Sequence, residues 1–345
     1  MPKTTLMSSC AALAVAVSAA GAAMAQDAPV TLRMSHWVPE THPIQQYGMT
    51  EWAQSINEAS GGTISIDFYP AQQLGQAGDH YDMARDGIAD ITFVNAGYQP
   101  GRFPIVGAGE LPFLFSNATG GSAALDAWYR PHAEEEMSDV HFCLVHLHAP
   151  GTFHARSPIR VPDDIDGMNV RPAHATMANF ISELGGQNSQ VSAPEARDAL
   201  SRGVADAITF PWNSILLFGI DEAVSYHTDM PLYATTFAWV MNQGSYDRLS
   251  EDQRAVIDDH CSTEWAERVA TGWAEVEESG REEIMGMDGH EVIELRDDEV
   301  ALWQEAAMPL IDIWADAVAE RGLVEDPMAL LDDLMAEIEE RGASY

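Results

Sequence analysis

The heptapeptide Asp166-Gly-Met-Asn-Val-Arg-Pro172 predicts a turn followed by a short strand that ends on an arginine and a proline. A helix, a Gly-Gly turn, another strand and an acidic helix follow, up to Ala205-Asp-Ala207. An arginine at a strand end can clamp a carboxylate, because its planar guanidinium matches both oxygens at once. The alternative is a surface arginine in an ordinary salt bridge, and this stretch alone leaves both interpretations open.

The N-terminus has the pattern of a secretory signal peptide. It combines a basic start at Lys3, an Ala-rich apolar core from Ala11 to Ala20 and a small-residue site at Ala23-Met-Ala25. The apolar core is too short and too rich in alanine for a transmembrane helix. We expect cleavage near Ala25 and a mature, soluble protein in the periplasm that begins near Gln26.

The composition excludes several classes of protein. The formal net charge is −37, and Lys3 is the only lysine in the chain. Nucleic-acid binding needs a basic surface, so we expect no nucleic-acid partner. The hydrophobic fraction of 46% is too high for a disordered chain, so the acidic residues indicate a solvated surface. Such a surface repels an anionic ligand unless local arginines reverse the field.

Strands and helices alternate along the first part of the chain. Apolar alternation predicts strands at 30–36, 63–69, 89–95 and 140–148. Predicted helices separate them, at 43–60, 79–87 and 121–138. This alternation indicates an α/β fold with largely parallel sheets. A second unit begins after Pro150-Gly151, and the long strand at 233–242 is expected to cross back between the units.

The last third of the chain is predicted to be mostly helical. Ser250-Glu-Asp-Gln253 has the signature of a capping box, and the helical pattern continues to about Gly286. A helix of that length can brace two lobes. A short strand at 291–295 and helices at 298–321 and 327–341 follow.

The predicted fold is a two-lobe, periplasmic-binding-protein-like α/β fold with a hinge cleft. Its expected parts are a signal peptide at 1–25, lobe I at 26–150 plus about 240–280, lobe II at 151–239 plus about 281–325, and a C-terminal helix at 326–345. Ligands of such sheets bind outside the carboxyl ends of the strands, and the lobes close on them.

Two cysteines remain after the predicted cleavage. Cys143 and Cys261 can form a disulfide in an oxidising compartment. Cys143 lies in an apolar strand, however, where a buried free thiol is equally ordinary. The sequence leaves both states open.

The histidines allow an enzymatic alternative. His146 and His148 share one face of a predicted strand, and with His141 or His154 they form a candidate metal site. A secreted metal-dependent hydrolase would follow from it. We favour the simpler interpretation, that strand ends at a lobe boundary collect polar aromatic side chains. Motifs of nucleotide-binding proteins, serine hydrolases and zinc proteases are absent from the sequence, so we predict no catalytic residue, metal or cofactor.

Six motifs, in this order and spacing over the mature chain, resemble the DctP-type solute receptors of TRAP transporters. They are Tyr69-Pro-Ala-Gln-Gln-Leu-Gly75, Asp86-Gly-Ile-Ala-Asp90, Glu110-Leu-Pro-Phe-Leu114, the segment 163–171, the segment 195–206 and the segment 242–253. The resemblance implies a monomeric receptor that captures a small organic acid and delivers it to TRAP membrane permease subunits driven by an ion gradient. A receptor for an ATP-driven importer is an alternative that these motifs disfavour.

The resemblance also implies a set of ligand contacts. The carboxylate-binding arginine of the family falls on Arg171. The other positions carried over by local match are His36, Trp37, Asn95, Tyr98, Phe153, Phe210, Trp212, Asn213 and Phe237.

The residue at position 153 and the aromatic side chains around Arg171 restrict the chemical class of the ligand. Phe153 stands where sialic-acid members of the family have a second arginine, and the direction of Arg156 is open, so one anchored carboxylate is the simplest expectation. Aromatic side chains around Arg171 suit a carboxylate with a flat apolar body or one that carries an organic cation. Candidates are aromatic acids, imidazole or pyrrolidone acids, betaine-like zwitterions and ectoine-like solutes. Core packing is the alternative role for each aromatic residue.

Overall fold

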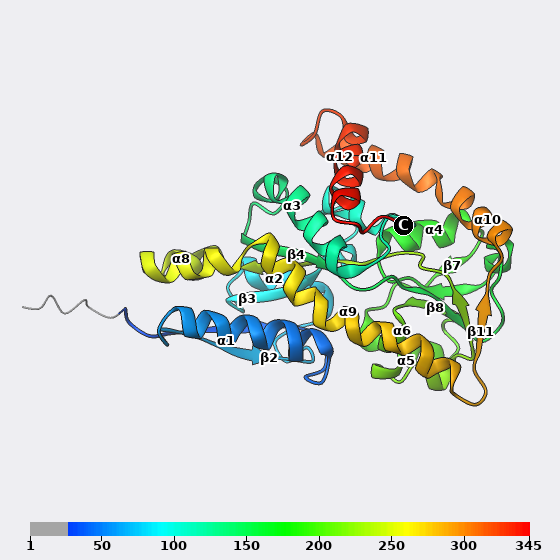
Figure 1. Cartoon of the computed structure of the whole chain (residues 1–345), viewed down its shortest axis with the longest axis horizontal. Helices are drawn as coiled ribbons and strands as arrows, with labels where there is room; N and C mark the ends of the chain where they lie inside the picture. The colour runs from blue at the N-terminus through cyan, green and yellow to red at the C-terminus, as the bar shows by residue number, and fades with distance from the viewer. Residues whose placement is uncertain (1–26) are drawn as a thin grey trace, which may run out of the picture.

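Two β-sheets organise the chain in the computed structural model, which describes residues 27–345 (Figure 1). The predicted signal peptide lies outside these residues. Helices flank both sheets, as expected for an α/β protein, and the predicted fold class is confirmed.

The first sheet has the strand order β2-β1-β3-β10-β4. Strand β1 is parallel to β2 and β3, whereas β10 is antiparallel to β3 and β4, so segment 233–242 returns to this sheet. The strands are β1 (Val30–Ser35), β2 (Ile64–Tyr69), β3 (Ile91–Asn95), β4 (His141–Leu147) and β10 (Thr236–Met241). We call the half of the molecule built on this sheet lobe I.

The second sheet has the strand order β11-β9-β5-β8-β6-β7 and defines lobe II. Strand β6 is parallel to β7 and β8, and β5 is antiparallel to β8 and β9. The strands are β5 (Thr152–Ala155), β6 (Asn169–Arg171), β7 (Gln187–Asn188), β8 (Ala207–Phe210), β9 (Tyr226–Asp229) and β11 (Glu291–Glu294).

Helices connect the strands of each lobe. Those of lobe I are η1 (Ile44–Met49, a π-helix), α1 (Thr50–Ala59), η2 (Ala77–Asp79), α2 (His80–Arg85), η3 (Ala96–Tyr98), η4 (Val106–Glu110), α3 (Ala118–Glu136), α7 (Gln243–Asp247) and α8 (Glu251–His260). Those of lobe II are η5 (Pro162–Ile165), α4 (Ala175–Glu183), α5 (Ala193–Ser201), α6 (Trp212–Leu217) and η6 (Asp221–Ala223).

The helix expected at 250–286 is two helices, α8 and α9 (Thr263–Met285). The break occurs because Cys261 and Ser262 leave the helical conformation, with ψ angles of 64° and 162°. Helix α9 alone is about 35 Å long, at 1.5 Å per residue. It contacts η1 and α3 in lobe I and α6 and β11 in lobe II, and it crosses the molecule in Figure 1. This shorter helix therefore spans both lobes.

The chain ends in three helices. They are α10 (Asp297–Ala307), α11 (Pro309–Arg321) and α12 (Pro327–Glu340). The helix expected at 298–321 is interrupted before Pro309, whose ring removes an N–H donor and favours a helix start. Helix α12 lies on α3, where the Trp128 indole N–H donates to the carbonyl of Leu330 at 2.9 Å.

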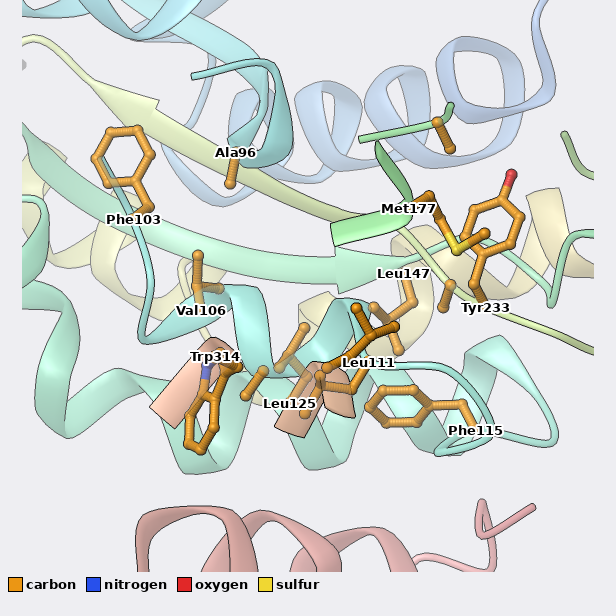
Figure 2. Packing of buried hydrophobic residues seen from close by; sticks show 14 of the residues in the cluster. Ala96, Phe103, Val106, Leu111, Phe115, Leu125, Leu147, Met177, Tyr233 and Trp314 are labelled. Carbon is orange, nitrogen blue, oxygen red and sulfur yellow. The ribbon is translucent and has the colours of Figure 1, made fainter. Parts of the chain in front are cut away.

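Each of the two buried apolar clusters contains residues from both lobes. One includes Leu147 of β4 and Met177 of α4, which Figure 2 labels in the same cluster as Tyr233. The other includes Trp37 of lobe I and Phe210 of lobe II. Burial of this apolar surface favours close packing of the two lobes. In the described part of the chain, no helix is long and apolar enough to cross a membrane.

Cys143 of β4 and Cys261 form a disulfide. Of the two states that the sequence left open, the structure has the bridge. It ties the α8–α9 junction to the edge strand of the first sheet.

Candidate ligand-binding site

Arg171 ends β6 and is almost fully buried, with 1% of its surface exposed. Its Nε donates to the carbonyl of Val191 at 2.9 Å, and its Nη2 donates to the hydroxyl of Tyr98 at 3.0 Å. No acidic side chain among residues 27–345 forms an ion pair with it. A buried charge is costly unless it is paired. The alternative of an ordinary surface salt bridge is therefore wrong.

A small cavity between the lobes lies against Arg171, with a volume of about 30 Å³. That volume is well below the range of typical small-molecule sites, so the lobes would have to move apart to admit an organic acid. The wall consists of Trp37, His42, Asn95, Tyr98, His148, Arg171, Ala173, Ala193, Phe210, Pro211, Ser214, Phe218, Tyr233, Thr235, Phe237 and Trp273. Most of these side chains are aromatic or apolar, and both lobes and α9 contribute to them.

The aromatic wall forms one connected set of rings. Trp37 stacks on Phe93 with ring centroids 5.3 Å apart, and it lies 6.2 Å from Phe237. Phe237 in turn lies 5.5 Å from Trp273 of α9. The guanidinium carbon of Arg171 lies 5.5 Å from the Phe210 ring centroid. The cavity thus presents ring faces next to a single cation.

Two polar atoms on the wall are buried without a hydrogen-bond partner among the described residues. They are Nε1 of Trp37 and the hydroxyl oxygen of Tyr233. Burial raises the pKa of the Tyr233 phenol, so this hydroxyl stays neutral. Buried polar atoms normally have partners, so these two atoms are exceptions among the buried polar groups of the wall.

The two wall histidines are neutral. Burial lowers the pKa of His42 to about 3 and that of His148 to about 4. The Nδ1 atom of His148 lies 2.6 Å from the carbonyl of Ala149 and donates to it, so its Nε2 accepts the Thr235 hydroxyl at 2.8 Å. The positive charge of the cavity therefore belongs to Arg171.

Glu277 of α9 positions two wall residues from behind. Its carboxylate accepts the indole N–H of Trp273 at 2.8 Å and the hydroxyl of Ser214. It also accepts the backbone N–H groups of Asn213 and Ser214, at 2.6 and 3.1 Å, at the start of α6. Burial raises the pKa of Glu277, and these four donors oppose that rise. The brace helix is thereby tied to the lobe II wall.

Six of the ten predicted contact residues line the cavity. They are Arg171, Trp37, Asn95, Tyr98, Phe210 and Phe237. The other four, His36, Phe153, Trp212 and Asn213, are not part of its wall.

Strand alternation explains two of these displacements. Phe153 of β5 pairs with Thr209, one residue before Phe210, so the two phenyl rings point to opposite faces of the sheet. The Phe153 ring lies in the core, 5.4 Å from the ring of Trp303. His36 precedes Trp37 and points away from it, toward Phe68 at 6.4 Å.

The start of α6 explains the other two. Pro211, Ser214 and Phe218 line the cavity, at the spacing of one helix face. Trp212 therefore points the other way, 5.2 Å from the ring of His154, and Asn213 lies against Glu277 through its backbone. The helical period in the sequence could have predicted Ser214 and Phe218, in place of Trp212 and Asn213, as cavity-lining residues.

Four further wall residues come from segments that the sequence did not connect to Arg171. Tyr233 and Thr235 precede β10, His42 precedes η1, and Trp273 lies in α9. Their aromatic or polar character was visible, but their shared location depends on how the lobes pack.

The histidines proposed as a metal site interact with other side chains. His141 stacks on Tyr246, His146 accepts the Trp239 indole N–H at 3.1 Å, and His154 lies 2.7 Å from a nitrogen of His227. Residues 27–345 contain no group of three or more His, Cys, Asp or Glu side chains suited to hold a metal. Arg156 donates to the carbonyl of Ala223 at 3.3 Å, outside the cavity.

The two lobes, the brace helix and the buried arginine at their interface define a solute-binding protein. Residues 34–317 match the family described as bacterial extracellular solute-binding protein, family 7 (DctP), and the chain belongs to this family. It is a solute receptor of the TRAP type and not an enzyme.

Solved structures of TRAP solute-binding proteins have the same fold. One from Rhodoferax ferrireducens, in complex with copurified benzoate, is 27% identical with a TM-score of 0.85, over 91% of this chain and 98% of that one. A marine metagenome protein specific for aromatic acids, with 3-hydroxybenzoate, is 28% identical with a TM-score of 0.85, over 91% and 99%. One from Bordetella bronchiseptica, with bound mandelate, is 28% identical with a TM-score of 0.84, over 90% and 99%.

Proposed function

We propose that this receptor captures a small aromatic monocarboxylate, with the carboxylate on Arg171 and the ring among the aromatic walls. One observation carries the proposal. Arg171 is 1% exposed, has no acidic partner among residues 27–345, and lies at the wall of an aromatic cavity. A ligand carboxylate would complete an ion pair that the protein leaves half built.

A single carboxylate suits this cavity better than two. Arg171 is the one arginine among the described residues that line it, and the wall histidines His42 and His148 are held neutral by burial. A second carboxylate would enter an apolar space without a cation, which is costly. Dicarboxylates are therefore disfavoured.

The body of the ligand is expected to be a single ring. Trp37, Phe237 and Trp273 offer faces and edges at distances typical of aromatic pairs. The aromatic acids bound by three proteins that are 27–28% identical to this chain support the same ligand class. A zwitterion with an organic cation is the second candidate, since the same ring faces can bind a cation.

The receptor is expected to work as a periplasmic monomer that delivers its ligand to TRAP membrane permease subunits. Family membership supports this role. Uptake by cells should then fail when the ion gradient is collapsed and persist when ATP is depleted. Uptake that depends on ATP would instead favour an ATP-driven importer.

Thermal-shift and calorimetric titration would test the ligand class. The panel contains benzoate, 3-hydroxybenzoate, mandelate, succinate and glycine betaine. Aromatic monocarboxylates should raise Tm, since a ligand that binds only the folded state stabilises it, whereas succinate should not. Stabilisation by betaine alone would replace the aromatic proposal with the zwitterion.

Arg171→Ala should reduce the affinity for the best acid of this panel by far more than tenfold, because each 1.4 kcal/mol is about tenfold and a lost buried charge partner costs several. Arg171→Lys keeps the charge but loses the fork, so it should recover part of the affinity. Arg156→Ala is the matched control, as its guanidinium bonds backbone carbonyls of lobe II outside the cavity. A loss of less than tenfold in Arg171→Ala would rule out the clamp.

A further inference from the structure

Tyr98 connects the two lobes at the ligand cavity. It ends η3, directly after β3 of lobe I. Its hydroxyl oxygen accepts Nη2–H of Arg171 at 3.0 Å and the backbone N–H of Ala193 at 2.8 Å. Both donors belong to lobe II, where Arg171 ends β6 and Ala193 begins α5.

The phenol proton of Tyr98 is not used in either bond. A guanidinium and a backbone amide can only donate, so the phenol oxygen is the acceptor in both. No hydrogen bond given by this hydroxyl is present among the described residues. Two accepted bonds, from a cation and from the N-terminus of a helix, leave a polarised O–H group that can donate to a further acceptor.

The position of Tyr98 directs that proton to the ligand. Tyr98 and Arg171 both line the ligand cavity and share one hydrogen bond. A carboxylate bound to the remaining N–H groups of Arg171 would therefore lie beside the phenol. A carboxylate has several acceptor sites, so it can accept the phenol O–H together with the guanidinium.

Tyr98 also forms part of a partition. A second, adjacent cavity is lined by Gly78, Pro172, His174 and Gln190, among others, and it shares the side chains of Tyr98 and Ala173 with the ligand cavity. Separation of the lobes would break both hydrogen bonds of the phenol and remove this partition.

We propose that Tyr98 is the latch of the receptor: its hydroxyl couples the ligand's carboxylate to closure of lobe I onto Arg171 and the start of α5. The proposal rests on the proposed function, because it needs a carboxylate ligand, but it does not need an aromatic one. Without that acceptor the O–H group of the partly buried Tyr98 has only water to bond, so an uncharged analogue gains less from closing the lobes.

The test uses Tyr98→Phe, which removes the hydroxyl and keeps the ring in the wall. With benzoate as the probe, calorimetry should give at least a tenfold loss of affinity, and small-angle scattering should give less compaction than in the wild type. Hydrogen exchange adds a local readout, since benzoate should protect the Ala193 amide in the wild type and protect it less in the variant. Tyr246→Phe is the matched control. It removes a hydroxyl that donates to Asp258 outside the cavity, so this variant should bind benzoate like the wild type.

A double-mutant cycle with Arg171→Ala separates a latch from a merely structural tyrosine. If both groups act on one carboxylate, Tyr98→Phe should cost little once Arg171 is gone. Affinity of Tyr98→Phe within twofold of the wild type, or unchanged protection of Ala193, would overturn the latch.

Failure of the proposed function would look different. If the wild type binds no aromatic acid, the ligand class is wrong, and the same variants are measured with the acid from the wider panel that raises Tm most. Binding of that acid with no effect of Tyr98→Phe overturns the latch, and a tenfold loss supports it.

Discussion

His174 and Glu110 meet across the boundary between the lobes, with Nδ1 of His174 3.1 Å from Oε2 of Glu110. Both side chains are fully buried. Nε2 of His174 lies 3.1 Å from the carbonyl of Ala234 and donates to it, so Nδ1 is an acceptor. Nδ1 also accepts the backbone N–H of Met177 at 3.3 Å, so it gives no proton to Glu110, and two acceptors 3.1 Å apart favour a protonated carboxyl group on Glu110. Burial raises the pKa of Glu110 to about 8 and lowers that of His174, in agreement with a neutral pair.

Glu110→Gln should make the stability less dependent on pH between about 4.5 and 8. The pKa of Glu110 is about 8 in the fold and near 4.5 in the unfolded chain, so the folded state binds the extra proton between these values. Stability therefore falls as the pH rises through this window, by up to about 1.4 kcal/mol per unit. Glutamine keeps a donor toward His174 without ionising.

The measurement for this variant is the free energy of unfolding by urea between pH 5 and 8.5. The slope should flatten in Glu110→Gln and remain in Glu305→Gln, a variant of an exposed glutamate. An unchanged slope in Glu110→Gln would show that this carboxyl is already ionised in the fold.

Acid should destabilise the protein through its buried histidines. Burial lowers the pKa to about 3 in His146, about 4 in His148 and about 4 in His227, whereas the unfolded chain titrates near 6.5. The unfolded state therefore binds more protons below pH 6.5, and stability is lost as the pH falls toward 4.

Calorimetric unfolding at pH 5.5 in buffers of different ionisation enthalpy would count these protons. We expect uptake of several protons per molecule and a Tm that declines steadily from pH 6.5 to 4.5. Unfolding without proton uptake would mean that these histidines titrate normally in the fold.

Removal of the disulfide should cost a large part of the stability. Cys143 and Cys261 are 118 residues apart in sequence. The loop-entropy model gives about 4–5 kcal/mol for a loop of this size, and native disulfides commonly contribute about 2–5 kcal/mol. The double variant Cys143→Ala, Cys261→Ala should melt well below the oxidised wild type. Wild-type protein in reductant is the control, and its Tm should fall like that of the double variant. Equal Tm values in the oxidised wild type, the reduced wild type and the double variant would contradict a structural role of the disulfide.

Gly280→Ala should disturb the contact between α9 and α6. A Cβ at this position would lie 2.3 Å from the backbone N of Asn213, so the two helices would have to separate. Overpacking of this kind costs about 1–3 kcal/mol and outweighs the helix propensity that alanine adds. Because Glu277 and Ser214 meet at the same contact, the affinity for the ligand should fall as well.

Gly286→Ala provides the matched control for this prediction. It lies at the end of α9, and a Cβ there would meet nothing closer than 3.4 Å. Denaturant titration and benzoate binding should change in Gly280→Ala and stay near wild-type values in Gly286→Ala. Equal stability and equal benzoate affinity in the two variants would show that α9 and α6 can separate without loss of stability.

The local sequence was sufficient for most of the strands and for the arginine. Alternation placed β1, β2 and β3 within a residue or two of their ends, and the motif 163–171 brought Arg171 to the end of β6. Local propensity did not predict where the long helices are interrupted. The disulfide-bonded Cys261 and the residue before Pro309 divide segments whose apolar period continues across them.

The sequence by itself determined the α/β class, the family and the position of Arg171 at a strand end, because strand periodicity, motif order and the end of a strand are local properties. Only the tertiary structure decided which side chains surround this arginine. Phe153 faces the core because of its pairing with Thr209, whereas Tyr233 and Trp273 reach the cavity from distant segments. The neutral state of Glu110 and the free proton of Tyr98 follow from contacts across the lobe boundary, and no single stretch of sequence contains both sides of such a contact.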